Sequence, residues 1–279
     1  MSYDGYDLIR FEREGSVLRA TVDNPPINLI TLPLFAELAR LSTELAEDQE
    51  VLVFVLKSAN ADFFLAHFDV AAILDFPTDR PAERGAAGDN PYHAMCERFR
   101  LMDKVTIARI EGRVGGGGSE LAMSFDMRFG VVGKTIVNQM EVPLGILPGG
   151  GGTQRLPRLI GRHRALEVIL GGVDLDAVTA ERWGYLNRAL TANEIGPYVD
   201  GLARRIASFP AEAVRLAKAS VNNADKPLDQ GQVEESYLFQ QSIRTDSARR
   251  AMARFLDIGG QTREGELQVA ELSGRLGEA

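Results

Sequence analysis

The chain has 279 residues, 45% of them hydrophobic and 25% charged, which is an ordinary globular composition and excludes a disordered chain. Its formal net charge of -8, from 31 basic and 39 acidic residues, disfavours nonspecific binding of nucleic acid. Cys96 is the only cysteine, which excludes an internal disulfide and a cysteine metal cluster and favours a cytoplasmic location.

The first predicted elements alternate between strands and helices. Val17–Val22 reads as a strand, and the turn signal Asn24-Pro25-Pro26 follows it. Thr31 can cap a helix whose leucines recur at helical spacing between residues 34 and 45. Residues 51–56 form an unbroken apolar run, so we expect a strand that is buried on both faces.

The same alternation continues through the middle of the chain. Residues 63–66 resume an apolar segment, and residues 76–91, which are rich in proline and glycine, predict a mobile surface excursion. A helix is expected at Pro91–Leu101 and a strand at Val105–Ile110. Residues 119–123 look helical, and residues 127–132 predict a further strand.

Beyond residue 160 nearly every segment predicts a helix. The expected helices cover residues 164–170, 178–183, 194–207, 211–221 and 232–256. This pattern predicts an α/β core over residues 1–200 and a helical region over residues 201–279, joined as one folded unit with a soft boundary.

Membrane and metal functions find no support in the sequence. No stretch approaches the roughly 20 apolar residues that a membrane helix needs, so we expect no membrane partner. The three histidines, His67, His93 and His163, lie far apart in the sequence, and none belongs to an HExxH motif. A zinc hydrolase is therefore not expected, and we predict no metal site.

Two runs of four glycines, at residues 115–118 and 149–152, are the most unusual feature. Glycine lets a ligand approach the backbone closely, which suits a phosphate or an oxyanion, although tight packing of a turn explains such a run equally well. Neither run fits a GxGxxG motif, and residues 117–121 are not a GxSxG nucleophile elbow. Glu120 directly follows the first run, and Glu141 stands in an apolar stretch. Taken singly, each glutamate is more simply explained as a structural or surface residue.

Together, these segments resemble a known family. Residues 110–126 (IEGRVGGGGSELAMSFD) look like the signature of the enoyl-CoA hydratase/isomerase (crotonase) family. Residues 141–156 match its second block, residues 64–69 (FLAHFD) its oxyanion segment, and residues 24–28 (NPPIN) its N-terminal block. The resemblance covers about residues 10 to 257, and this order of blocks is far more specific than a single glycine run.

The resemblance implies a crotonase-like ββα spiral core with a C-terminal helical region used in trimerisation. Such enzymes act on acyl-CoA thioesters in fatty acid metabolism, as homotrimers or dimers of trimers, and coenzyme A is part of the substrate rather than a cofactor. By position, the backbone amides of Phe68 and Gly117 form the oxyanion hole. The expected substrate-binding residues are Ala66, His67, Phe68, Asp69, Gly116 and Gly117.

By the same resemblance, Glu120 and Glu141 form the catalytic pair of a hydratase, which adds or removes water across the 2,3 bond. We assign water activation to Glu120, because an amide-rich helix start keeps it ionised, and proton exchange at Cα to Glu141, because its surroundings are apolar. The alternatives are an isomerase, a thioester hydrolase, a decarboxylase, or a degenerate noncatalytic acyl-CoA binder.

The chain also departs from the family pattern. His67 stands where the family usually has glycine, which is what suggests the degenerate binder, and Phe68 is bulkier than the usual residue. The separation of Glu120 and Glu141 is one residue longer than in typical members. We expect His67 to adopt a glycine-like backbone conformation with positive φ. The alternative is an ordinary backbone from which His67 points to solvent.

Overall fold

The computed structural model describes residues 3–79, 81, 83–86 and 88–277 and divides into two compact units. The first unit is the chain up to Met102 together with Thr106–Val199, and the second is Asp103–Val105 together with the chain from Asp200. Residues 80, 82 and 87 of the predicted excursion, and residues 278 and 279 of the predicted helical region, lie outside the described residues.

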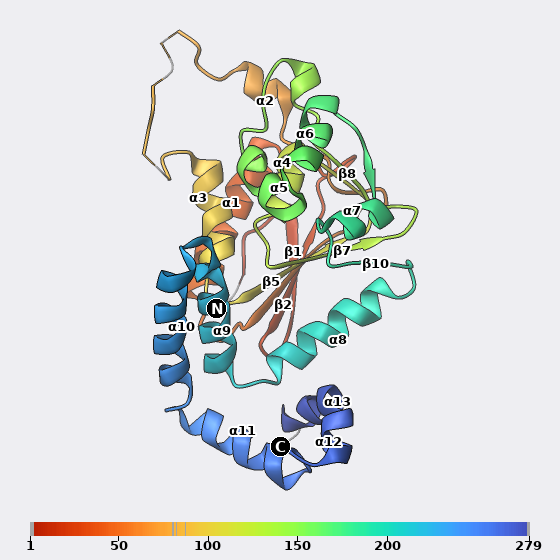
Figure 1. Ribbon diagram of the computed structural model, residues 1–279. Helices are drawn as coiled ribbons and strands as arrows, with labels where there is room; N and C mark the ends of the chain where they lie inside the picture. The colour runs from red at the N-terminus through yellow and green to blue at the C-terminus, as the bar shows by residue number, and fades with distance from the viewer. Residues whose placement is uncertain (1–2, 80, 82, 87, 278–279) are drawn as a thin grey trace. The chain divides into compact units, whose positions relative to one another are not determined.

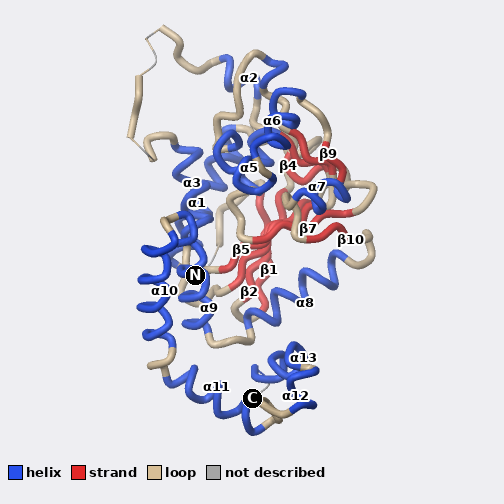
Figure 2. Tube along the Cα trace, in the orientation of Figure 1, coloured by secondary structure: helices blue, strands red, loops and turns tan. Residues whose placement is uncertain are grey.

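The first unit is built on two sheets, whose strands are drawn in red in Figure 2. The larger sheet contains, in spatial order, β1 (Ile9–Glu14), β2 (Val17–Val22), β3 (Val53–Ser58), β5 (Val105–Ile110), β7 (Met127–Val131) and β10 (Arg188–Leu190). The smaller sheet contains β4 (Phe63–Leu65), β6 (Arg113–Gly115), β8 (Ile136–Asn138) and β9 (Leu175–Asp176). The predicted strand at 51–56 begins two residues later, at Val53.

The chain winds as a spiral, because each turn gives one strand to each sheet and then a helical segment. β3 joins the larger sheet and β4 the smaller, and β5 and β6, then β7 and β8, repeat this order. β4 pairs parallel with β6, and β6 pairs parallel with β8, so the carboxyl ends of the three short strands meet at one edge. This arrangement confirms the predicted α/β spiral core.

Helices pack around these sheets in the first unit. They are α1 (Leu32–Glu47), α2 (Val70–Leu74), α3 (Pro91–Leu101), α4 (Gly116–Ala122), η1 (Val142–Leu144), α5 (Gly152–Ile160), α6 (Arg162–Gly171) and α7 (Ala177–Trp183). Figure 1 shows α1 beside α3 and α4 beside α5, and these pairs are in contact. Thr31 caps α1 as predicted, accepting from Leu34 N at 3.4 Å, and the helix buries its leucine stripe completely.

The second unit is helical, and α8 (Ile195–Ala207) leads into it. Its further helices are α9 (Ala211–Asn222), η2 (Asn223–Asp225), α10 (Leu228–Ser242), α11 (Asp246–Asp257), α12 (Arg263–Leu267), α13 (Val269–Gly274) and η3 (Arg275–Gly277). The single helix predicted over residues 232–256 is wrong. Thr245 interrupts it, because its side chain accepts from Ala248 N at 3.1 Å and caps a new helix, α11.

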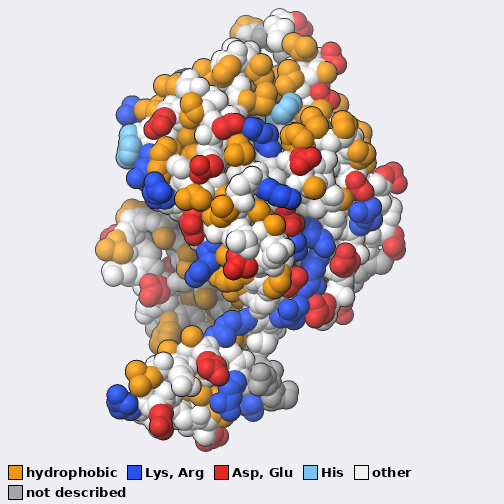
Figure 3. Space-filling model, turned by 90° about the vertical axis from the view of Figure 1, so that its right-hand side faces the viewer, with side chains coloured by type: hydrophobic (Ala, Val, Ile, Leu, Met, Phe, Trp, Pro, Cys, Tyr) orange, Lys and Arg blue, Asp and Glu red, His pale blue; other side chains and the backbone are white. Residues whose placement is uncertain are grey.

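One face of the molecule carries charges of both signs. On the face drawn in Figure 3, basic and acidic side chains are interspersed, with hydrophobic side chains between them.

Candidate active site

The segments that follow the three short parallel strands carry the predicted site residues. β4 leads to Phe68, β6 leads directly into Gly117 and Glu120, and β8 leads to Glu141. Because β4, β6 and β8 are neighbours in that order, their carboxyl ends bring three distant parts of the chain to one place.

Phe68 is held by a short pairing with the segment before α1. Ile30 N donates to His67 O at 2.9 Å, and Asp69 N donates to Ile30 O at 3.0 Å. Alternate amides of an extended segment point to opposite sides, so the Phe68 amide between these bonds points away from Ile30. The Phe68 amide can therefore donate a hydrogen bond to another acceptor.

Gly117 lies directly against Phe68. A Cβ atom added at Gly117 would stand 3.2 Å from Phe68 Cβ and 3.4 Å from Phe68 N. The Gly117 amide belongs to the first turn of α4, where backbone N–H groups have no partner within the helix. The structure thus brings together the two residues predicted to form the oxyanion hole.

Glu120 is one turn inside α4, because that helix begins at Gly116 rather than at residue 119 as predicted. Its Oε1 accepts from Gly150 N at 2.8 Å and from Gly152 N at 2.7 Å. Burial raises the pKa of Glu120, and these two hydrogen bonds oppose the rise. The expectation that amides at its own helix start hold the charge was therefore wrong: the second glycine run supplies them.

Glu141 occupies a more apolar position at the start of η1, with only 8% of its surface exposed. Among the described residues its buried Oε2 atom has no hydrogen-bond partner. Burial, and then the nearby charge of Glu120, raise the pKa of Glu141 to about 7. Gly116 makes room for this carboxyl, because a Cβ there would stand 3.0 Å from Glu141 Oε1, and its φ of 43° also favours glycine.

A cavity of about 590 Å³ joins these groups. Both glutamates line it, together with His67, Phe68, Gly116 and Gly117. Its other lining residues are mostly apolar: Leu32, Phe35, Val70, Ile73, Phe76, Asn90, Pro91, Tyr92, Met140, Leu144, Ile146, Leu147, Gly149 and Gly150.

Two predicted substrate-binding residues lie outside this lining. Ala66 is buried with 5% of its surface exposed, and its carbonyl oxygen packs against Gly115. Asp69 caps α2, because its side chain accepts from Ala71 N at 2.9 Å. Contact of these two residues with substrate stays a prediction.

The expectation of positive φ at His67 was wrong. Among the described residues other than glycine, only Asn28 and Gln261 have positive φ. His67 is half-buried and lines the cavity, and its Nδ1 lies 2.8 Å from Phe68 O. Gly116, which lies beside His67 in space, leaves room for the histidine side chain: a Cβ atom at Gly116 would stand 3.1 Å from His67 Cβ. His67 therefore needs no glycine-like backbone conformation.

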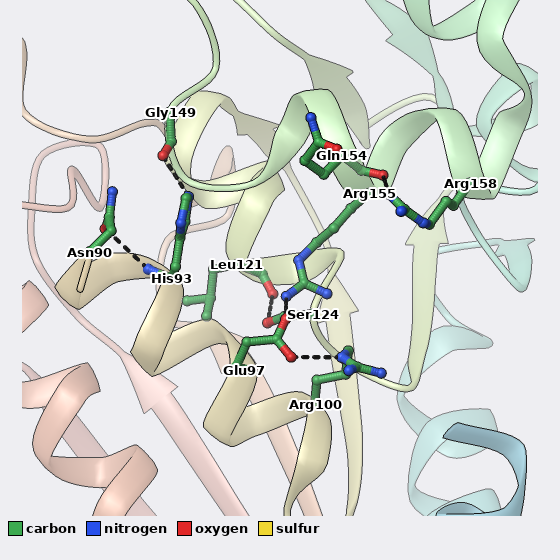
Figure 4. A network of polar contacts seen from close by, with 10 residues as sticks. All are labelled: Asn90, His93, Glu97, Arg100, Leu121, Ser124, Gly149, Gln154, Arg155 and Arg158. Carbon is green, nitrogen blue, oxygen red and sulfur yellow. Dashed lines mark hydrogen bonds and ion pairs between the residues drawn. The ribbon is translucent and has the colours of Figure 1, made fainter. Parts of the chain in front are cut away.

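The sequence did not identify the role of α3. His93 Nε2 lies 2.8 Å from Gly149 O, and Glu97 joins Arg100 of its own helix to Arg155 of α5 (Figure 4). Tyr92 lines the cavity and donates from its hydroxyl to Gly117 O at 2.6 Å. The predicted helix 91–101 was correct, but periodicity does not reveal which of its side chains reach another loop.

Within the part of the chain that the structure describes, no helix is long and apolar enough to cross a membrane. The described residues also include no cluster of three or more histidine, cysteine or acidic side chains suited to a metal ion.

Comparisons with known proteins agree with this geometry. The family model described as enoyl-CoA hydratase/isomerase matches residues 12–262. The short-chain-enoyl-CoA hydratase of Clostridium acetobutylicum is 31% identical over 248 residues, which cover 88% of this chain and 93% of the relative. The crotonyl-CoA hydratase of Syntrophomonas wolfei is 30% identical over 254 residues, covering 90% of this chain and 96% of the relative.

A solved structure supports the same assignment. The crystal structure of an enoyl-CoA hydratase from Bacillus anthracis superposes with a TM-score of 0.82 at 26% identity, covering 90% of this chain and 96% of that chain. The spiral core, the paired glutamates and the matched sequence over most of the chain lead to one conclusion. The chain belongs to the enoyl-CoA hydratase/isomerase family.

Proposed function

We propose that the protein is an enoyl-CoA hydratase, which adds water across the 2,3 double bond of an enoyl-CoA thioester or removes it in the reverse direction. The observation that carries this proposal is the presence of two carboxyl groups, Glu120 and Glu141, in one cavity with the Phe68 and Gly117 backbone. The protein's membership of the enoyl-CoA hydratase/isomerase family and its similarity to hydratases support the same reaction.

The two amides stabilise the thioester oxygen when it carries negative charge. Attack of water at Cβ moves electrons towards that oxygen and gives an enolate, and donors that are already in place stabilise it without reorganisation. One such donor typically contributes about 3 kcal/mol to the transition state.

The two glutamates divide the proton transfers. Glu120 accepts a proton from the attacking water, because the Gly150 and Gly152 amides stabilise its carboxylate. Glu141, whose pKa is about 7, holds a proton in part of the population at neutral pH and delivers it to Cα of the enolate. The product gains a hydroxyl at Cβ and a hydrogen at Cα, and proton exchange between the two carboxyls and solvent restores the enzyme.

Turnover of crotonyl-CoA, followed by loss of the enoyl absorbance, tests this function. Glu120→Gln and Glu141→Gln should each lower turnover by about 100- to 10,000-fold with CoA-ester binding largely retained. If only Glu141→Gln removed activity, a one-glutamate isomerase would replace the hydratase. If neither substitution affected any acyl-CoA reaction, the catalytic interpretation would be wrong.

The assembly and location of the protein are part of the same proposal. A homotrimer or dimer of trimers is supported by exposed apolar side chains on α10 and α11, among them Val233, Tyr237, Phe239 and Met252. We further propose that the enzyme works in the cytoplasm and needs no cofactor, since coenzyme A arrives as part of the substrate. Light scattering that showed a stable monomer at micromolar concentration would contradict the assembly.

A further inference from the structure

Tyr92, in the first turn of α3, contacts three of the segments that build the site. Its hydroxyl donates to Gly117 O at 2.6 Å. Its ring meets the Phe68 ring edge-on, with centroids 5.9 Å apart and planes at 81°. A Cβ atom added at Gly150, whose amide binds Glu120, would stand 2.8 Å from Tyr92 Cδ1. One side chain therefore contacts both oxyanion residues and the loop that holds a catalytic carboxylate.

The hydrogen bond from Tyr92 restricts the Gly117 backbone, which has more conformational freedom than an ordinary helical residue. It stands in a run of glycines, each about 1 kcal/mol less favourable in a helix than alanine. A glycine backbone also has more accessible conformations than any other residue, so the direction of its amide is weakly fixed by local preference. A hydrogen bond to the carbonyl of the same residue restricts that freedom.

The Tyr92 side chain is held in place by packing and by the connections of its helix, α3. Its ring stacks on Phe35 of α1, with centroids 5.7 Å apart and planes at 18°. Asn90 caps α3, and His93 and Glu97 connect the same helix to the second glycine run and to α5 (Figure 4). Packing against α1 and the connections of α3 to other elements therefore hold the Tyr92 hydroxyl at Gly117 O.

The phenol remains a donor at any pH at which the enzyme would be assayed, because burial raises the pKa of Tyr92 well above its ordinary value of 10. A donated hydrogen bond to Gly117 O is the only role that this neutral group needs to perform.

We propose that Tyr92 is a positioning residue that fixes the Gly117 amide against Phe68 and so sets the geometry of the oxyanion hole. This inference rests on the proposed hydratase function. It assigns Tyr92 no proton transfer and no covalent step.

Tyr92→Phe tests the proposal, because it removes the hydroxyl and keeps the ring. The matched control is Tyr185→Phe: Tyr185 is a buried tyrosine whose hydroxyl lies 2.9 Å from Ser119 Oγ of the same helix, α4, and it does not line the cavity. Two measurements are made on each variant. The first is crotonyl-CoA hydration, separated into kcat and KM, and the second is the absorbance of a bound cinnamoyl-CoA ester, which moves to longer wavelength when its carbonyl is polarised.

We expect Tyr92→Phe to lower kcat by about 10- to 100-fold, less than the 100- to 1,000-fold loss caused by removing an oxyanion donor itself. KM should change little, and the red shift of the bound cinnamoyl-CoA should shrink. The spectrum is recorded with saturating ligand, which stabilises a weakened variant. Tyr185→Phe should retain the full red shift.

Two results would overturn the proposal: a wild-type kcat and red shift in Tyr92→Phe, or an equal loss of red shift in Tyr185→Phe, which would indicate general loosening of α4. Failure of the hydratase function itself appears separately, as wild-type protein that does not hydrate crotonyl-CoA.

Discussion

Replacing Glu141 by glutamine should stabilise the folded protein at alkaline pH while it lowers activity. The pKa of Glu141 is raised from 4.5 to about 7 in the folded state. A carboxyl with a raised pKa favours folding in its protonated form, so its contribution is complete below pH 4.5 and is lost as the pH rises through about 7. Glutamine stays neutral throughout, so the variant keeps that contribution at pH 8.

The size of this effect follows from the two pKa values. Their difference corresponds to at most about 3 kcal/mol, at roughly 1.4 kcal/mol for each pH unit. Access of solvent through the cavity screens the carboxylate, so we expect about 1 to 2 kcal/mol at pH 8. The substitution breaks no hydrogen bond of Oε2, because that atom has no partner among the described residues.

Chemical denaturation of the wild type and Glu141→Gln at pH 5 and pH 8 measures the effect. The free energy of unfolding of the variant minus that of the wild type should be larger at pH 8 than at pH 5. Asp174→Asn is the control of opposite sign, because hydrogen bonds from Arg113 lower the pKa of Asp174. That variant should lose the same stability at pH 5 and at pH 8, and the loss should disappear only in more acid solution, as the pH falls below the ordinary pKa of 3.8. An equal stability difference for Glu141→Gln at both pH values would refute the reasoning.

Four other substitutions test separate parts of the structure. Gly150→Ala should lower turnover, measured with crotonyl-CoA, because the added methyl would collide with Glu120 Oε2 and displace that carboxylate. Asn28→Ala should lower the free energy of unfolding by about 2 to 4 kcal/mol in a denaturant titration. The completely buried Asn28 amide loses its hydrogen bonds, including one of 2.7 Å to Ser58 Oγ, and alanine tolerates the positive φ of this position poorly. Thr245→Ala should cost about 1 kcal/mol through loss of a helix cap, seen as reduced helicity or earlier thermal unfolding. His67→Gly should preserve or raise activity in the same hydration assay, and abolished turnover in a folded variant would give this histidine a direct chemical role.

Long elements could be predicted from the sequence because their patterns repeat. The leucine stripe and the capping Thr31 indicated α1, and the unbroken apolar run at residues 51–56 indicated β3. The three-residue strands of the smaller sheet are too short to show a period, so the sequence showed only the apolar segment at residues 63–66, and β6 and β8 were missed. β1 was missed because most of its residues are exposed or half-buried and four of its six are charged.

The site could be predicted only where local sequence defines it. The glycine runs and the two glutamates are recognisable in order, but the sequence does not show that Gly150 and Gly152 bind Glu120, because that contact joins residues about 30 positions apart. Tyr92 was missed for the same reason, since nothing in residues 90–94 indicates a partner at Gly117. The error at His67 came from reading one position in isolation, whereas the needed space is provided by Gly116.

The smaller sheet has a consequence for how this enzyme can change. Its three parallel strands each lead into a separate segment, and the proposed groups are divided among these segments: an amide after β4, an amide and a carboxylate in α4 after β6, and a second carboxylate after β8. Substitutions in the loop after β8 can therefore remove or replace the proposed proton donor, Glu141, while the segments after β4 and β6 keep the two proposed oxyanion amides. Directed evolution towards another acyl-CoA reaction should start with a library confined to residues 139–147, because β4, β6 and the proposed oxyanion residues that follow them then remain untouched.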